Sequence, residues 1–307
     1  MKYFIITIDT EGDNIWSYKA ERNNLLLPET KNADSLMRFQ QLCEKYHFFP
    51  TYLVDYEMAR SPVFIDFGRD IVKREMGEIG MHMHAFSTPP FYELADLKGR
   101  GLAFAGEYPQ DILYQKMEYM TKILQDTFQV EITSHRGGRW YLDKGILNIL
   151  DKLGYKVDCT VTPGINWRLT KGQTGVSEGS DYSRYKPILY RIRGTHLKEL
   201  PMTILNRIRF SVKKEKIFQS QKIWMRPNGS NLSDLLWLIK RIESSNVDYI
   251  EFMLHSSELM EAGSPTFRSR KDIETLYSHM EILFTHLTEL GYKGISCSNY
   301  VKNFKKI

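Results

Sequence analysis

Residues 3–13 read YFIITIDTEGD, an apolar run that stops abruptly at acidic residues. Its β-branched and aromatic side chains predict a buried strand over Tyr3–Asp9. Asp9, Glu11 and Asp13 then bring three carboxylates into five residues, and these repel one another unless a cation or a bound proton compensates. Asp9 and Glu11 are two apart, so in an extended chain they point to the same face. The alternative interpretation is a turn with helix-capping acids.

Short apolar runs alternate with longer amphipathic patterns over the rest of the chain. This alternation predicts an α/β fold with a mostly parallel sheet covered by helices, and seven to eight repeats favour a (β/α) barrel over an open sheet. We find no linker and expect residues 1–307 to form a single domain. The predicted strands are 3–9, 51–55, 78–84, 132–136, 156–160, 197–201, 249–255 and 294–297, and the predicted helices are about 32–46, 63–75, 109–128, 143–153, 232–245 and 270–290.

The composition is that of a globular protein, with 42% hydrophobic and 26% charged residues. A formal net charge of +5 gives little support to nucleic-acid binding. Basic residues cluster at 207–222 and 302–306. These clusters fit an anionic glycan, a nucleotide-linked sugar or a membrane surface, but a solvated face is the simpler explanation.

The three cysteines, Cys43, Cys159 and Cys297, are widely spaced and odd in number, so no disulfide framework is implied. Acidic residues follow the start too early for a secretory apolar region. No apolar run approaches the roughly 18 to 20 residues of a membrane span. We therefore expect a cytoplasmic protein without a transmembrane segment, and its oligomeric state stays open.

Three further predicted strands also end in polar residues. The strand that begins near residue 78 ends with His82 and His84, whose imidazoles project to one face and can share a metal such as zinc. The strand near 132 ends in Arg136 and the strand near 249 ends in His255. Taken singly, each fits a satisfied core histidine or a structural salt bridge. In a barrel, however, these strand ends converge on one mouth, where they would serve metal-assisted hydrolysis.

Five stretches together resemble the polysaccharide deacetylase superfamily, also called the NodB-homology domain or carbohydrate esterase family four. They are ITIDTEGD, GEIGMHMHAF, SHRGGRW, GYKVDCTVTPG and FMLHSSEL, in the family's order and over nearly the whole chain. The resemblance is greatest to the branch found among bacterial surface-polysaccharide genes. It implies a distorted (β/α) barrel, usually of seven strands.

The resemblance also implies roles for the residues at the strand ends. Asp9 would be the catalytic base, Arg136 would steady it, and His255 would be the general acid. His82 and His84 would bind the metal, which in this family is a divalent cation, most simply zinc.

Two positions depart from the family pattern. Thr10 replaces the second aspartate of the first motif, so Glu11 becomes the expected carboxylate ligand, with Asp13 or the base itself in reserve. Phe86 stands where the family's helical spacing would place a histidine, so His84 must substitute on a more extended backbone.

The sequence thus predicts a metal-dependent hydrolase that removes an acyl group, most simply N-acetyl, from a sugar or glycan precursor for surface polysaccharide. Trp16, Trp140, Trp167 and Tyr182 fit sugar contacts near the rim, although core packing explains each as well. An amidohydrolase acting on a non-sugar amide, an O-deacetylase and a catalytically silent carbohydrate-binding protein remain alternatives. The first-motif acids and His255 argue against the silent protein, because a pure binder needs neither.

Overall fold

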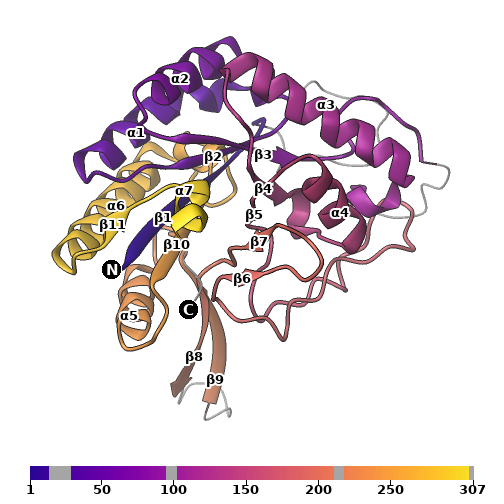
Figure 1. Ribbon diagram of the computed structural model, residues 1–307. Helices are drawn as coiled ribbons and strands as arrows, with labels where there is room; N and C mark the ends of the chain where they lie inside the picture. The colour runs from indigo at the N-terminus through magenta and orange to yellow at the C-terminus, as the bar shows by residue number, and fades with distance from the viewer. Residues whose placement is uncertain (14–28, 95–101, 211–217, 304–307) are drawn as a thin grey trace.

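A curled sheet forms the centre of the computed structural model, which describes residues 1–13, 29–94, 102–210 and 218–303 (Figure 1). Its nine strands follow the order β10-β1-β2-β3-β4-β5-β7-β6, with β11 beside β1. All neighbours in this sheet are parallel except β6 and β7. The bounds are β1 Tyr3–Thr10, β2 Thr51–Val54, β3 Glu78–Met83, β4 Ser134–Gly137, β5 Val157–Asp158, β6 Tyr190–Arg191, β7 Lys198–Glu199, β10 Tyr249–His255 and β11 Lys293–Gly294.

Helices cover the outside of this sheet, as the strand–helix alternation predicts (Figure 1). Each outer helix buries one apolar stripe against it; α1, for example, buries Leu36, Phe39 and Cys43. No helix in the described ranges is both long and apolar enough to cross a membrane. The bounds are α1 Leu36–Lys45, α2 Pro62–Lys73, α3 Gln110–Phe128, α4 Lys144–Lys152, α5 Leu232–Glu243, α6 Arg270–Glu289 and α7 Cys297–Asn303.

The two ends of the curled sheet are joined by single backbone hydrogen bonds rather than by a regular ladder. Met202 N–H donates to the carbonyl of Val161 at 3.0 Å, and Met225 N–H donates to that of Thr203 at 2.9 Å. Met253 N–H on β10 then donates to the carbonyl of Met225 at 3.2 Å. These bridges close the circuit irregularly, which gives the distorted barrel that the sequence predicts.

Side-chain alternation divides β1 between two environments. Phe4, Ile6 and Ile8 join the large apolar core beneath the helices. Thr7 and Asp9 point the other way, toward Glu251 and Arg136 in the barrel interior. The barrel interior is therefore polar near the C-terminal ends of the strands, and the catalytic candidates lie there.

The strand predicted at 294–297 is present beside β1, but its predicted C-terminal bound is wrong. Only Lys293–Gly294 pair with β1, and α7 begins at Cys297. Cys297, Tyr300 and Val301 recur at helical spacing and are buried in one apolar cluster with Ile5 of β1. That burial favours a helix over a continued strand.

A two-stranded antiparallel hairpin, β8 (Ile204–Phe210) and β9 (Phe218–Trp224), is missing from the prediction. Its sequence contains alternating basic residues and no continuous apolar run, so it is easily mistaken for a solvated basic segment. Figure 1 shows the hairpin projecting from the barrel near α5 and β10.

Candidate metal centre and active site

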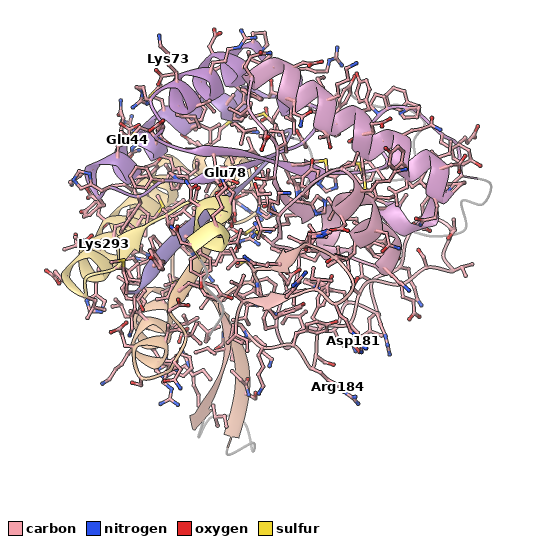
Figure 2. The ribbon with its side chains drawn as sticks, in the orientation of Figure 1. Glu44, Lys73, Glu78, Asp181, Arg184 and Lys293 are labelled. Atoms are coloured by element: carbon pink, nitrogen blue, oxygen red, sulfur yellow. The ribbon has the colours of Figure 1, made fainter. Side chains whose placement is uncertain are left out.

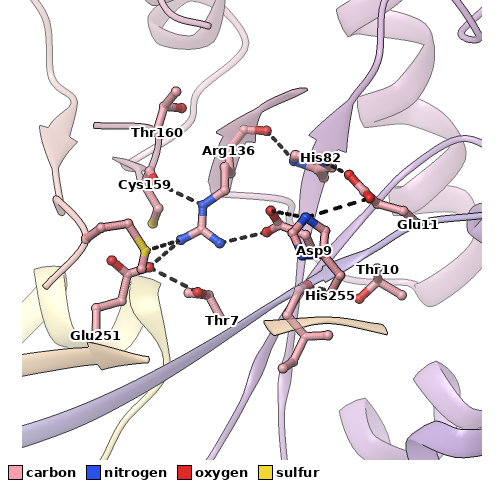
Figure 3. A network of polar contacts seen from close by, with 12 residues as sticks. Thr7, Asp9, Thr10, Glu11, His82, Arg136, Cys159, Thr160, Glu251 and His255 are labelled. Carbon is pink, nitrogen blue, oxygen red and sulfur yellow. Dashed lines mark hydrogen bonds and ion pairs between the residues drawn. The ribbon is translucent and has the colours of Figure 1, made fainter. Parts of the chain in front are cut away.

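The parallel register brings the predicted site residues to one end of the barrel. Asp9 on β1 is paired with His255 on β10, and His82 on β3 is paired with Arg136 on β4. Glu11 follows β1 directly, and its backbone N–H donates to the Ser256 hydroxyl at 3.0 Å. Figure 3 shows these side chains converging. The sequence-based expectation of one shared mouth thus has a geometric basis in strand register.

Glu11, His82 and His84 form a buried cluster able to hold a metal ion. Glu11 Oε1 lies 2.6 Å from His82 Nε2 and 2.8 Å from His84 Nε2. His82 Nδ1 lies 2.9 Å from the carbonyl oxygen of Arg136. Because a carbonyl only accepts, Nδ1 carries a proton and donates to it, which turns Nε2 toward Glu11. Nε2 donates to Glu11 when it is protonated, and it would offer its lone pair to a cation once that proton is lost.

The electrostatics of this cluster favour a positive charge. Burial alone would raise the pKa of Glu11, but the charge of His255 and the hydrogen bonds from His82 and His84 hold it well below its usual range. Burial likewise would lower the pKa of His82, yet Asp9 and Glu11 raise it. Two imidazole nitrogens and one carboxylate oxygen are a donor set typical of catalytic zinc. The residues present therefore fit the divalent cation implied by the family resemblance.

A second set of donor atoms lies beside the first and shares Glu11 with it. His255 Nε2 is 3.9 Å from Asp9 Oδ2 and 4.0 Å from Glu11 Oε2. These distances are too long for direct hydrogen bonds but leave the three groups facing one another. The base and acid candidates consequently lie on the same side of Glu11, next to the metal-capable cluster.

Arg136 is fully buried between two carboxylates (Figure 3). Its Nη1 donates to Asp9 Oδ1 at 2.6 Å, and its Nη2 donates to Glu251 Oε1. Thr7 also donates to Glu251 Oε1, at 3.0 Å. Burial raises the pKa of Glu251 to about 7, even though Arg136 and the hydrogen bond from Thr7 oppose the increase. Glu251 fixes Nη2 of Arg136, and this orients Nη1 toward Asp9.

Sequence reasoning missed Glu251, although a signal for it existed. An acid stands in the middle of the otherwise apolar strand Tyr249–His255, four residues before His255. Strand periodicity places residues 251 and 255 on the same face, and that face leads to the mouth.

His255 has its own two supporting residues, which the sequence did not reveal. Its backbone N–H donates to Glu258 Oε2 at 2.9 Å, and Arg226 Nη2 lies 2.9 Å from both Glu258 Oε2 and His255 Nδ1. Burial would raise the pKa of Glu258, but Arg226 and His255 lower it to about 2. Glu258 is therefore ionised at neutral pH, and the pair holds the Nδ1 side of the imidazole while Nε2 faces the acids.

Asp13, the reserve ligand, lies outside the metal-capable cluster. Its carboxylate accepts from the backbone N–H groups of Lys31 and Asn32, at 2.9 and 3.0 Å. Asp55, at the end of β2, similarly accepts from the N–H groups of Gly12 and Met58. The first motif thus uses one acid for the cluster and another to fix the turn that carries it.

The predicted aromatic residues occupy different environments. Trp140 lies 5.0 Å from the Arg136 guanidinium and contacts Trp224, with ring centroids 5.9 Å apart. Trp167 also contacts Trp224, with ring centroids 6.3 Å apart. Tyr182 is only 4% exposed, and its hydroxyl donates to the carbonyl of Trp140 at 2.9 Å. It therefore holds the backbone of Trp140 in place and is itself too buried to contact a sugar.

Trp224 ends β9 of the unpredicted hairpin, so the sequence did not indicate its place beside Trp140. Trp16 lies outside the described residues. The aromatic wall beside the mouth is therefore Trp140, Trp224 and Trp167 within the described ranges.

The fold of this α/β barrel is similar to that of a solved polysaccharide deacetylase-like protein and of two other carbohydrate-active enzymes. The chain superposes on a protein from Mycobacterium smegmatis provisionally described as a polysaccharide deacetylase, with a TM-score of 0.51 and 12% identity, over 95% of this chain and 93% of that one. No family model matches the sequence, and no curated protein sequence matches it. The structural likeness to the Mycobacterium smegmatis protein establishes the distorted-barrel fold.

Two enzymes of other activities share the same barrel. A GH57 branching enzyme from Thermococcus kodakaraensis gives a TM-score of 0.57 at 10% identity, over 100% of this chain and 72% of that one. A 4-alpha-glucanotransferase from Thermococcus litoralis gives 0.54 at 10% identity, over 99% of this chain and 39% of that one. Activity must therefore be argued from the site rather than from the barrel.

Proposed function

We propose that the protein is a metal-dependent carbohydrate deacetylase that hydrolyses an N-acyl group, foremost N-acetyl, on a sugar or glycan precursor. One observation carries the proposal: Glu11, His82 and His84 form a metal-capable cluster directly beside Asp9 and His255. A cation site, a carboxylate and an imidazole grouped at one end of the barrel are the components that metal-assisted hydrolysis of an amide requires. The shared fold with polysaccharide deacetylases supports a sugar as substrate.

Asp9 is the base in this proposal. Arg136 holds its Oδ1, which leaves Oδ2 toward the open side of the cluster and toward His255. Oδ2 accepts the proton of the water that attacks the carbonyl carbon. A divalent cation held by Glu11, His82 and His84 would polarise that carbonyl and acidify the water.

His255 is the acid. Its Nε2 faces Asp9 and Glu11, and its Nδ1 side is held by Arg226 and Glu258. As the tetrahedral species breaks down, Nε2 gives a proton to the departing amine, and acetate and the free amino sugar leave.

The experiment combines metal analysis with acetate release. Purified protein should contain about one divalent cation, lose activity on chelation and recover it when zinc is returned. Release from N-acetylated oligosaccharides should exceed release from acetanilide or from O-acetylated sugars. A metal-loaded protein that binds oligosaccharides but releases no acetate from any of these would instead be a silent carbohydrate-binding protein.

A further inference from the structure

The excess positive charge of the chain is concentrated in one segment. Residues 204–226 contain seven Lys or Arg and one Glu, a net charge of +6, whereas the whole chain carries +5. The remaining residues are thus almost neutral, with 35 basic and 36 acidic side chains. This segment includes the β8–β9 hairpin, which projects from the barrel (Figure 1). Within the described ranges this segment contributes Arg207, Arg209, Lys222 and Arg226, and such an asymmetry indicates an anionic partner.

One face of the hairpin is connected to the proposed active site through Trp140 and Arg136. Trp224 and Lys222 are two apart on β9, so their side chains share a face. At the inner end of that face, Trp224 contacts Trp140, which lies against Arg136. Farther out, Lys222 extends its ammonium group over Gly164, where an added Cβ would lie 2.6 Å from Nζ. The glycine leaves room for the lysine beside the loop that follows β5.

The opposite face anchors the hairpin to the barrel. Arg207 and Arg209 both form ion pairs with Asp234 on α5, and Arg207 also lies 5.0 Å over the Trp237 ring. Lys222, in contrast, forms no ion pair with any residue in the described ranges and is exposed. The uncompensated cation is therefore on the face that continues into the mouth.

We infer that this face of the β8–β9 hairpin, from Trp224 to Lys222, binds an anionic part of the substrate. The inference rests on the proposed function and narrows its substrate to a glycan that bears a carboxylate or phosphate. A strand rises roughly 3.3 Å per residue, so Lys222 lies about 7 Å beyond Trp224. Since Trp224 is itself separated from Asp9 by Trp140 and Arg136, the anionic group lies beyond the sugar that carries the N-acetyl group.

The test compares two N-acetylated tetrasaccharides of equal length, a hyaluronan tetrasaccharide with uronate carboxylates and a neutral chitin tetrasaccharide. Binding to metal-free protein is followed by tryptophan fluorescence, so no turnover is needed. At low salt the anionic tetramer should bind about fivefold more tightly, and this preference should vanish near 1 M salt, where the Debye length is about 3 Å. Lys222→Glu should abolish the preference.

Lys73→Glu is the matched control, because Lys73 is an exposed lysine on α2 at the far side of the molecule from the hairpin (Figure 2). It should keep the preference. Equal binding of the two tetramers, or a preference that survives Lys222→Glu, would overturn the inference. Sedimentation with phosphatidylglycerol vesicles that depends on Lys222, without any glycan preference, would show a membrane-binding surface and also overturn it.

Failure of the proposed function gives a different result. If the preference for the anionic tetramer is present and depends on Lys222, but no acetate is released by metal-loaded protein, the binding surface stands and the deacetylase assignment falls.

Discussion

Replacing Arg136 by methionine removes the cation that pairs with both Asp9 and Glu251 while keeping a long side chain in the barrel interior. Arg136 has no exposed surface, and both carboxylates are buried with it. Removing one partner of a buried ion pair leaves an uncompensated charge in a poorly solvated place, which typically costs 3–5 kcal/mol. Glu251 can avoid part of that cost by staying protonated, since its pKa is already raised to about 7.

The expected loss in the free energy of unfolding is therefore about 3 kcal/mol at pH 7, a large fraction of the roughly 5–15 kcal/mol typical of folded proteins. Activity should fall further, because Asp9 loses the donor that aims it. Urea unfolding followed by circular dichroism measures the first effect, and acetate release measures the second. Glu251→Gln offers a milder second variant that retains Arg136.

Arg38→Met provides the control. Arg38 makes the same kind of pair with Glu274, through two hydrogen bonds of 2.8 and 2.7 Å, but the two side chains are 49% and 51% exposed. Exposed pairs contribute about 0–1 kcal/mol, so this variant should lose about 1 kcal/mol or less. If Arg136→Met were no more destabilised than Arg38→Met, the description of the barrel interior as a buried charge network would be refuted.

Three further results are expected. The pKa of Glu258 lies near 2 in the folded chain and near 4.5 in the unfolded chain. Ionised Glu258 therefore stabilises the fold by about 3 kcal/mol above pH 4.5, and this contribution is lost as the pH falls toward 2. In Glu258→Gln, the free energy of unfolding measured in urea should depend less on pH between about pH 5.5 and 2.5 than in the unmodified protein. Asp9→Asn should reduce acetate release at least about 100-fold and still bind the metal. The double variant His82→Ala, His84→Ala should contain no metal when it is measured by elemental analysis, and metal retained in it would exclude that ligand set. Trp224→Ala should raise KM for an N-acetylated tetrasaccharide several-fold with a smaller change in kcat. An unchanged KM would show that the aromatic wall does not bind the substrate.

Much of the barrel and of its site was predictable, because both depend on short-range patterns. Strand periodicity puts His82 and His84 on one face, and parallel strands bring their polar ends together. The helices α1 to α6 follow from apolar spacing, and each was predicted within a few residues of its observed bounds. The sequence therefore specifies which side chains meet, provided that the strands are recognised.

What the sequence could not reveal depends on contacts between distant segments. Arg226 reaches His255 only because the β8–β9 hairpin returns to the barrel beside β10, and nothing in its local sequence signals that path. Glu258 is three residues after His255, so its role as a support looks like an ordinary helix cap. Tyr182 resembles an exposed loop aromatic in sequence, yet the fold buries it behind Trp140.

The most direct test is a crystal structure of zinc-soaked protein, with anomalous scattering measured at the zinc edge. We predict one zinc ion with Glu11, His82 and His84 at about 2.0–2.2 Å, and with Asp9 and His255 uncoordinated on its open side. A zinc ion held instead by Asp9 and His255, or no ordered zinc at these residues, would exclude the proposed ligand set.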